Sequence, residues 1–269
     1  MAGPKRIRSL ARGLQVLHAL QATPIASLHA LFLATRIPKP TLLRILVTLE
    51  EMGAVSRRLG DGHYRISALN RVARKRDRYD RVAEAAAPVL DRLCHRVSWP
   101  SDLMVPAGDH MEIRETSLVR TPFSTYFMHE RIGKPVNWVL SAVGRAYLAY
   151  CPDKEREKIL TLLRKSNKAE NWLARDVKRF DRILADTRRN GFGVRDGSYV
   201  GGTYGQNDPD GLAGIAVPLL DGGRVYGVIN IIWAKAAHSV EDMARHHLAD
   251  LQDAAAEIAV SLRTQPRTL

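Results

Sequence analysis

The sequence predicts an α+β protein with three parts: an N-terminal winged helix-turn-helix, a linker helix, and a C-terminal domain with a mixed sheet and flanking helices. Three observations support this prediction. Residues 1–67 hold three apolar-periodic helices and then two short strands, residues 68–98 continue as a long helical pattern, and residues 99–269 alternate strands with helices. We expect the domain boundaries at these positions.

The first predicted helix carries a single apolar face. Its apolar residues recur at steps of three and four and are Ile7, Leu10, Leu14, Leu17 and Leu20. Arg8 and Arg12 lie off this stripe and are expected to contact DNA. Pro24 follows the end of the helix. Ser27 can cap a second helix and is also expected at the DNA. This helix ends at the Ile37-Pro38 pair because a residue before proline avoids helical geometry.

The third predicted helix starts at Pro40, a residue type that suits the first turn. Its core positions are Leu42, Ile45, Leu46 and Leu49. Its entrance and outer face carry Lys39, Thr41, Leu43, Arg44, Val47 and Thr48. A short turn between two helices, with Arg and hydroxyl groups outside the second, is the layout that places a helix in the major groove of DNA. There Arg44 can pair with guanine or phosphate, and Leu43 can touch a thymine methyl group.

Two short strands after this helix predict a β-hairpin wing. The strands span residues 54–59 and 63–66, and the Gly60-Asp61-Gly62 turn joins them. The wing side chains expected at the DNA are Arg57, Arg58, Tyr64 and Arg65. The arginines would contact phosphates.

The charge of the chain is concentrated in its first third. The net charge is +13. Residues 1–80 hold 15 Lys and Arg against 5 Asp and Glu, whereas residues 81–269 hold 26 against 23. This imbalance indicates a polyanion-binding module attached to a part with another task. A winged helix that binds only proteins is the alternative, and the local charge argues against it.

A seam of residues spaced by three and four continues through the connecting segment. The seam positions are Leu69, Val72, Arg76, Tyr79, Ala83, Ala86, Leu90, Leu93 and Val97. Pro88 interrupts the pattern and is expected to start a fresh helix. The seam suits pairing with the same helix of a second chain. The alternative is packing on the second domain of the same chain, and both can hold in part.

The second domain shows no motif of a known catalytic chemistry. We expect strands over residues 102–106, 111–116, 124–129, 191–195, 213–219 and 225–233, and helices over 141–150, 154–163, 174–190 and 240–262. There is no Gly-x-Ser-x-Gly, His-Glu-x-x-His or Walker pattern. Cys94 and Cys151 are too few for a disulfide scaffold and are expected as buried thiols. We therefore expect no cofactor, no metal site and no enzymatic activity.

Arginine and aromatic residues of this domain form a candidate pocket for an aromatic carboxylic acid. The arginines that could hold the carboxylate are Arg114, Arg120 and Arg195. The aromatic residues that could wall the ring are Trp99, Tyr126 and Trp138. The alternative is that the tryptophans lie in the core and the arginines on the surface.

Both predicted domains contain residues that match the pattern of a known family. In the head these are Ser27-Leu28, Ile37-Pro38-Lys39-Pro40-Thr41, Arg44-Ile45-Leu46, Thr48-Leu49-Glu50, Gly53 and Tyr64-Arg65-Ile66. In the second domain they are Gly133-Lys134-Pro135, Ser141-Ala142-Val143-Gly144-Arg145-Ala146, Leu148-Ala149, Gly191-Phe192-Gly193 and Ile215-Ala216-Val217-Pro218-Leu219. On these residues the chain resembles the IclR-type family of bacterial transcriptional regulators over nearly its whole length. Segments similar to the activators of hydroxyphenylpropionate catabolism are Trp99-Pro100-Ser101-Asp102, Arg114-Glu115-Thr116 and Leu148-Ala149-Tyr150-Cys151-Pro152.

This resemblance implies a DNA-binding winged helix-turn-helix, a linker helix and a GAF-like effector domain, in homodimers that often pair into homotetramers. It also implies a small-molecule pocket, whose positions here are Ser141, Ala142, Val143, Arg195, Gly214, Asn230 and Ile232. Some members have an acidic residue near Arg195 and a cysteine near Gly214. They also have serines near Asn230 and Ile232. This chain lacks those residues at these positions. The difference favours a larger aromatic acid over the small oxo-acids that such members bind.

The observations together predict a ligand-responsive regulator of an aromatic-acid catabolic operon, bound to a palindromic double-stranded operator as a dimer or tetramer. No apolar run approaches the roughly 18 residues of a membrane helix, and no signal peptide is expected. We therefore expect a cytoplasmic protein without a membrane partner. One alternative is an enzyme acting on a small aromatic acid, with the basic head used for localisation. Another is a nucleoid or RNA-binding protein, which the aromatic content of 6% disfavours.

Overall fold

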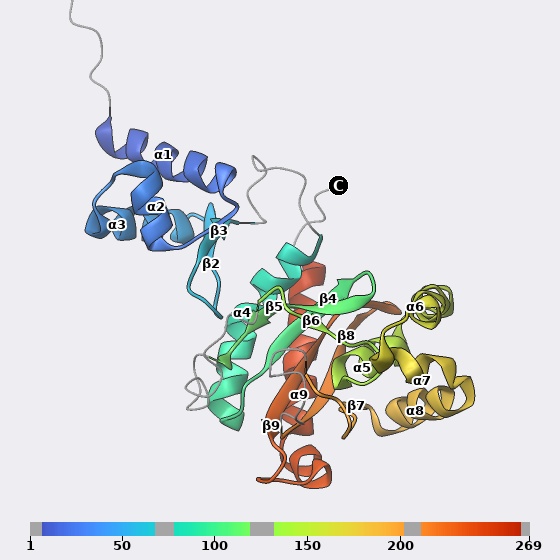
Figure 1. Cartoon of the computed structure of the whole chain (residues 1–269). Coiled ribbons are helices and arrows are strands. Elements are labelled where there is room, and N and C mark those ends of the chain that lie inside the picture. The colour runs from blue at the N-terminus through green and yellow to red at the C-terminus, as the bar shows by residue number, and fades with distance from the viewer. Residues whose placement is uncertain (1–6, 68–77, 119–131, 202–210, 265–269) are drawn as a thin grey trace, which may run out of the picture. The chain divides into compact units, whose positions relative to one another are not determined.

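The computed structural model describes residues 7–67, 78–118, 132–201 and 211–264. Its contacts divide the chain into two compact units, residues 1–84 and 85–269. Helices and strands occur in both units, as the predicted α+β class requires (Figure 1). Each unit is described by itself below.

The first unit is a three-helix winged head. Its elements are α1 (Arg8–Ala22), β1 (Ile25–Ala26), α2 (Leu28–Thr35), α3 (Lys39–Glu51), β2 (Val55–Arg57) and β3 (Tyr64–Ile66). The three strands form an antiparallel sheet in the order β1-β3-β2. The predicted helix-turn-helix and wing are thus confirmed, and α3 begins at Lys39, one residue before the predicted start.

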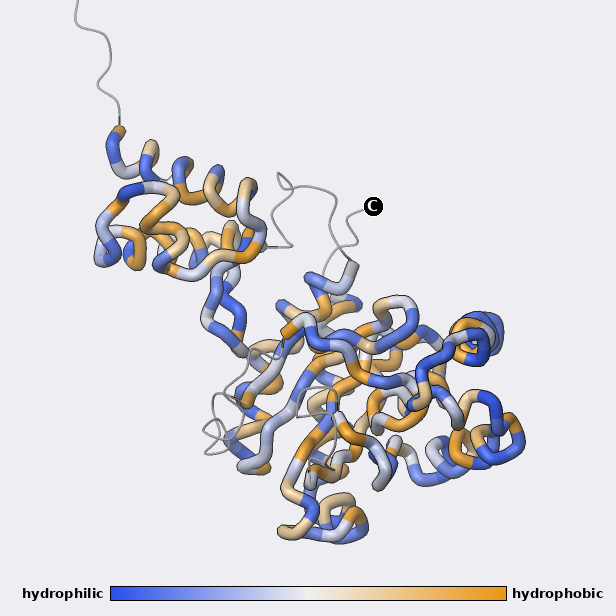
Figure 2. Tube along the Cα trace, in the orientation of Figure 1, coloured by the Kyte–Doolittle hydropathy of each residue, from blue (hydrophilic) through white to orange (hydrophobic). Residues whose placement is uncertain are grey.

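The core of the head involves only part of the predicted α1 stripe. Val16 and Leu20 are buried with residues of α2 and α3. Ile7, Leu10 and Leu14 are instead 64%, 58% and 48% exposed. The predicted helix and its apolar stripe are therefore present, but the stripe is buried only toward the C-terminal end of α1. Figure 2 shows hydrophilic and hydrophobic residues interspersed along this helix.

Local hydrogen bonds set the limits of α2. The Ser27 hydroxyl accepts a hydrogen bond from the amide of Ala30 at 3.1 Å, so it caps the helix as predicted. The helix ends at Arg36, whose φ of 58° is left-handed and turns the chain toward α3. This turn sets the direction in which the chain enters α3.

The second unit contains a six-stranded sheet. After α4 (Arg78–Val97) its elements are β4 (Asp102–Ala107), β5 (His110–Thr116), β6 (Pro135–Val136), α5 (Ala142–Tyr150), α6 (Asp153–Lys165), a 3₁₀ turn (Ala169–Asn171), α7 (Trp172–Arg175), α8 (Val177–Asn190), β7 (Gly193–Val194), β8 (Leu212–Asp221), β9 (Arg224–Ala234) and α9 (Val240–Thr264). The strand order is β6-β5-β4-β9-β8-β7. Every pairing among the described strands of this sheet is antiparallel. The described sheet is therefore antiparallel, whereas the sequence predicted a mixed sheet. The predicted strand over residues 124–129 lies outside the described residues.

Helices cover both faces of this sheet (Figure 1). Ala216 and Val228 belong to a buried cluster with the residues of α5. The alternate positions Ile215, Ile229 and Ile231 are also buried, on the face that α9 covers. Burial on both faces explains why β8 and β9 read as nearly continuous apolar runs.

Helix α4 packs inside its own chain. It is one helix with Pro88 in its interior, so the prediction of a fresh start at Pro88 is wrong. The seam residues Ala86, Leu90, Leu93 and Val97 are buried in the second unit. Two ion pairs, Arg92 with Glu257 and Arg96 with Asp250, join α4 to α9. The intramolecular alternative therefore holds for this part of the seam, and Leu69, Val72 and Arg76 lie outside the described residues.

Both cysteines are free and buried, as predicted. Burial raises the pKa of Cys151 to about 12, so its thiol stays protonated at neutral pH. Among the described helices none is both long enough and apolar enough to cross a membrane. The described residues also contain no group of three His, Cys, Asp or Glu side chains that could hold a metal ion.

Candidate functional site

The outer face of α3 is the first candidate site. Leu42 and Leu46 hold the helix on the head core with no exposed surface. Arg44 and Thr48 are exposed on the opposite side, and the Thr48 hydroxyl donates to the Arg44 carbonyl at 3.0 Å. Leu43 and Val47 add apolar surface there, because they are 43% and 50% exposed. Exposed leucine and valine beside an exposed guanidinium suit base edges in a major groove better than they suit bulk water.

The entrance of α3 and the start of α1 add further side chains of the predicted set. Lys39 and Pro40 are exposed and Thr41 is half-buried at the first turn of α3. Arg8 and Arg12 are exposed on α1. These positions are open to solvent, which is the condition that a phosphate contact requires.

The wing offers one exposed arginine rather than three. Arg57 is exposed, donates to the Gly62 carbonyl at 3.1 Å and lies 5.7 Å from the centre of the Tyr64 ring. Arg58 is buried, and its guanidinium lies 3.2 Å from Asp61. Arg65 is buried as well and donates to the Ser56 hydroxyl at 3.2 Å. The prediction that Arg58 and Arg65 are free for phosphates is therefore corrected.

Tyr64 and Ser27 have structural tasks in the head. Tyr64 is buried in the head core on β3, and the hydroxyl of Ser27 is used by the helix cap. Both were predicted to lie at the DNA. Their described contacts fix the wing and the start of α2 instead.

The second candidate site lies on the sheet face that α5 covers. Gly214 is paired with Ile232 and Ala216 with Asn230 across β8 and β9, and opposite residues of a strand pair share a face. Because Ala216 packs in the α5 cluster, Gly214, Asn230 and Ile232 also face that side. The structure thus brings these three predicted positions together, although Asn230 and Ile232 are buried.

Arg195 follows β7 at the edge of this face. Its amide donates to the Gly214 carbonyl at 3.0 Å, and its guanidinium donates to the Tyr199 carbonyl at 3.0 Å. The guanidinium also lies 4.4 Å from the centre of the Tyr199 ring. A Cβ placed on Gly214 would meet the Ile231 carbonyl oxygen at 3.4 Å and the Arg195 Cβ at 4.0 Å, so the glycine lies directly beside the arginine. These contacts hold the half-buried Arg195 against the Tyr199 ring.

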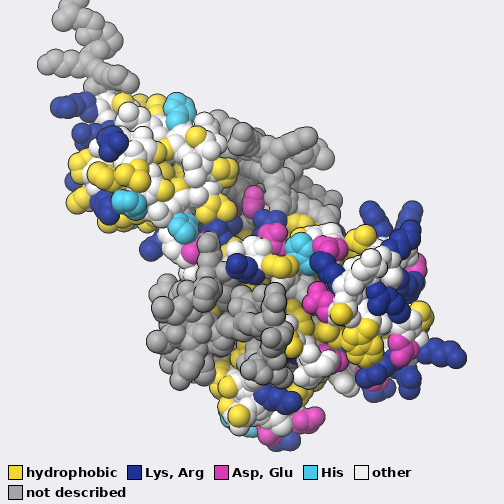
Figure 3. Space-filling view, in the orientation of Figure 1, with side chains coloured by type: hydrophobic (Ala, Val, Ile, Leu, Met, Phe, Trp, Pro, Cys, Tyr) yellow, Lys and Arg dark blue, Asp and Glu magenta, His cyan; other side chains and the backbone are white. Residues whose placement is uncertain are grey.

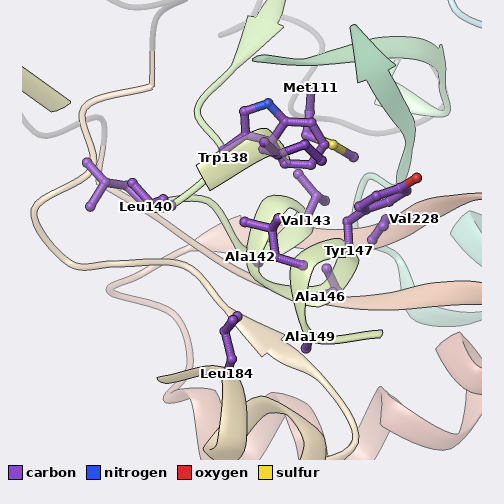
Figure 4. Close-up of a cluster of buried hydrophobic side chains, with 14 of the residues drawn as sticks. Met111, Trp138, Leu140, Ala142, Val143, Ala146, Tyr147, Ala149, Leu184 and Val228 are labelled. Atoms are coloured by element: carbon purple, nitrogen blue, oxygen red, sulfur yellow. The ribbon is translucent and has the colours of Figure 1, made fainter. Parts of the chain in front are cut away.

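The start of α5 packs against this face of the sheet. Ser141 caps the helix by accepting from the Gly144 amide at 3.0 Å, and its hydroxyl donates to the Asn137 carbonyl at 2.5 Å. Ala142 and Val143 are packed in the buried cluster around Trp138 (Figure 4). All three predicted pocket positions are therefore buried and hold the helix in place.

Arg145 holds the segment around Arg195 in place, a role that the sequence pattern did not predict. Its buried guanidinium donates to the carbonyls of Val139 and Val194 at 2.8 and 2.9 Å, and to the Asp196 carboxylate at 2.5 Å. Burial lowers the pKa of Arg145, and the carboxylate opposes this shift. Burial acts to raise the pKa of Asp196, but bonds from Ser198 and Arg145 outweigh it and hold that pKa below its usual range. Arg145 thus fixes the segment that carries Arg195.

Asn137 ties the same segment to the loop before α5. Its side-chain oxygen accepts from the amides of Val139 and Leu140, both at 2.8 Å. The backbone amide of Asn137 donates to the Tyr199 hydroxyl at 3.0 Å. Asn230 has a similar structural contact, since its side-chain oxygen accepts from the Asp102 amide at 2.7 Å and joins β9 to β4.

The predicted aromatic wall does not form as one surface. Trp138 is fully buried, and its indole nitrogen donates to the Gly108 carbonyl at 3.2 Å, just after the end of β4. Trp99 lies before the start of β4, where its ring meets His238 edge-on. The two tryptophans therefore lie at opposite ends of one strand. The third predicted wall residue, Tyr126, lies outside the described residues.

The predicted arginine cluster is also divided. Arg114 alternates on β5 with Met111 and Ile113, which point into the α5 cluster, so Arg114 faces the other side of the sheet. It lies 2.8 Å from Glu112. Arg114 and Arg195 therefore cannot clasp one carboxylate, and Arg120 lies outside the described residues.

Solved structures of similar fold come from several bacteria. An IclR family transcriptional regulator from Brucella abortus aligns with a TM-score of 0.53 and 21% identity over 96% of this chain and 93% of its own. An IclR homologue from Microbacterium hydrocarbonoxydans, complexed with 4-hydroxybenzoate, aligns with a TM-score of 0.53 and 20% identity over 96% of this chain and 100% of its own. The Thermotoga maritima IclR aligns with a TM-score of 0.51 and 19% identity over 96% of this chain and 99% of its own.

Sequence comparisons agree with these structures. A curated relative, the probable transcriptional regulator SauR of Cupriavidus necator, is 26% identical over 217 residues, which are 78% of this chain and 79% of the relative. The family model of the IclR helix-turn-helix domain matches residues 9–59. The family model of the C-terminal domain of the bacterial transcriptional regulator IclR matches residues 78–260, well over half of the sequence. The chain therefore belongs to the IclR family of bacterial transcriptional regulators.

Proposed function

We propose that this regulator controls genes for the catabolism of an aromatic acid, with that acid as its effector and a palindromic operator as its DNA site. The family consists of DNA-binding transcriptional regulators with an effector-binding C-terminal domain, not of enzymes. The proposal extends this to an effector class, an operator symmetry and an assembly of two or four chains. The proposal also assigns residues 1–67 to the DNA-binding domain, residues 68–98 to the linker and residues 99–269 to the effector-binding domain.

The single observation that carries the effector class is the setting of Arg195. The Arg195 guanidinium lies over the Tyr199 ring and next to Gly214, so it places a planar cation beside a position without a side chain. A planar guanidinium is the group best suited to a carboxylate. Two neighbouring positions on that face, Ala216 and Ile232, are apolar, and Asn230 uses its side-chain oxygen for a contact with β4. The 4-hydroxybenzoate complex of the Microbacterium homologue supports an aromatic carboxylate in this class of domain.

The operator proposal rests on the outer face of α3. Two such helices in a dimer would enter successive major grooves, about 34–36 Å apart, and would read a palindrome. The face combines one exposed arginine, Arg44, with the apolar Leu43 and Val47. It suits a half-site with a guanine flanked by thymines. The acid would act by binding one arrangement of the two heads better than the other.

Replacing Arg195 by alanine is expected to weaken acid binding by about 10- to 100-fold, because a charge-assisted hydrogen bond contributes roughly 1.5–3 kcal/mol. Affinity for operator DNA without acid should stay unchanged. Isothermal titration of the purified chain with phenylpropionate-type and benzoate-type acids measures the first effect, and a mobility shift measures the second.

Arg224→Ala is the matched control for this change. The Arg224 guanidinium also lies over a tyrosine, 5.0 Å from the centre of the Tyr226 ring, but it is exposed at the β8–β9 turn. Its removal should leave acid binding at the parent level. An Arg195→Ala chain that binds the acids as tightly as the parent would refute the proposed carboxylate contact.

A further inference from the structure

The excess positive charge of the second unit is confined to α6, α7 and α8. Residues 153–190 hold 12 Lys and Arg against 7 Asp and Glu. The rest of residues 81–269 hold 14 against 16, so they are slightly acidic. Figure 3 shows Lys and Arg side chains gathered over the region where these three helices lie. This charge is separate from that of the DNA-binding head and needs its own explanation.

Several of these cations are not neutralised by neighbours. Three ion pairs exist within the segment: Arg156 with Asp153, Arg164 with Glu157, and Arg189 with Asp186. Lys168 pairs with Asp109 outside the segment. In the part of the chain that the structure describes, the other eight cations have no carboxylate within 4.0 Å, namely Lys154, Lys158, Lys165, Arg175, Lys178, Arg179, Arg182 and Arg188. Five of these eight lie on α7 and α8, and all eight are exposed.

Apolar side chains lie among these cations. Trp172, the first residue of α7, is 38% exposed, and Val177, the first residue of α8, is 45% exposed. The Arg179 guanidinium lies 5.0 Å from the centre of the Trp172 ring, which fixes both side chains on one surface. We call Trp172, Arg175, Val177 and Arg179 the Trp172 surface. Tryptophan and arginine in contact are the residue types that contribute most to protein interfaces.

We propose that the Trp172 surface binds an acidic segment of a protein partner, which places an apolar side chain against Trp172 and carboxylates against Arg175 and Arg179. The charge of the surface selects an acidic occupant. Its exposed tryptophan and valine favour protein over duplex DNA, because phosphates would neutralise the arginines but would leave both apolar side chains uncovered. For a transcriptional regulator, such a partner is a protein that is present at the same promoter.

The Trp172 surface is connected to the segment that carries Arg195. Asn171, directly before Trp172, accepts a hydrogen bond from the Asn137 side chain at 3.0 Å. Asn137 in turn donates to the hydroxyl of Tyr199, on which Arg195 lies. Partner contact and effector contact would thus share one rigid support. The partner proposal itself does not depend on which acid binds.

The proposal is tested on the full chain with a labelled synthetic peptide that carries glutamates and leucines at helical spacing. A scrambled peptide of the same composition and a random-sequence DNA duplex serve as comparison probes. Fluorescence anisotropy at physiological salt should show binding of the patterned peptide and weaker binding of the scrambled one. Trp172→Ala and Arg179→Ala should each weaken it about tenfold or more, as hot-spot residues do.

Trp172→Phe keeps an aromatic ring and should retain most of the binding, and Arg224→Ala, outside the Trp172 surface, should retain all of it. Two results would overturn the proposal. One is a peptide affinity that is absent, or equal in the parent and in both alanine variants. The other is a loss of duplex affinity in Arg179→Ala with no loss of peptide affinity, which would make this surface a second DNA contact.

Discussion

Replacing Arg44 by alanine is expected to abolish sequence-specific operator binding while the head keeps its fold. Arg44 is exposed on the outer face of α3, away from the buried Leu42 and Leu46. A bidentate arginine–base pair contributes about 1–3 kcal/mol of discrimination. A dimer would lose two such pairs, which approaches the roughly 4–10 kcal/mol that separates specific from non-specific binding.

Arg57→Ala is the matched comparison on the same unit. Arg57 lies on the wing, where the loss of a phosphate contact would weaken binding to all DNA sequences evenly and reduce the salt dependence of the affinity by about one released counterion per chain. Mobility shifts with the DNA upstream of the gene, at two salt concentrations and with excess competitor, separate the two patterns. Footprints of Arg44→Ala that match those of the parent at moderate salt would remove Arg44 from the interface.

Replacing Gly144 by alanine is expected to destabilise the second unit severely. A Cβ at this position in α5 would lie 2.0 Å from the Trp138 carbonyl oxygen, closer than atoms can approach. That backbone cannot move freely, because the Trp138 indole and the neighbouring Asn137 are both anchored by hydrogen bonds. Overpacking of this kind costs about 1–3 kcal/mol or more. The Ser141 cap and the support of Arg195 would be displaced with it.

Gly13→Ala is a control substitution that is expected to stabilise its own unit instead of destabilising it. Gly13 lies inside α1, and no described atom comes within 4 Å of the Cβ that alanine would add. This change should stabilise the head by about 0.5–1 kcal/mol. All four tryptophans lie between residues 99 and 233, so tryptophan fluorescence during urea unfolding reports only on the second unit. Its midpoint should fall for Gly144→Ala and stay constant for Gly13→Ala. An unchanged midpoint for Gly144→Ala would contradict the close approach.

The recognition helix was predictable because its sequence pattern is local. Leu42 and Leu46 mark one face by spacing alone, and Arg44 and Thr48 then must lie on the other. The wing was less predictable. Consecutive arginines at 57 and 58 look equivalent in sequence, but Asp61 in the turn draws Arg58 inward and leaves Arg57 outside.

The support of the effector face could not be predicted from local patterns. Arg145 is held by three acceptors from residues 139, 194 and 196, which only the tertiary fold brings together. The same holds for Arg114 and Arg195, whose opposite faces follow from strand register. For α4, a seam spaced by three and four indicates that a helix is buried on one side, but the pattern does not say whether the partner is the same chain or another.

The most direct test of the regulator proposal is a footprint on the DNA upstream of the gene, with competitor DNA, with and without a panel of phenylpropionate-type and benzoate-type acids. The proposal predicts a discrete protected site with two related half-sites, and one acid that strengthens or releases the protection. Binding that competitor DNA removes completely, with no acid having any effect, would contradict it.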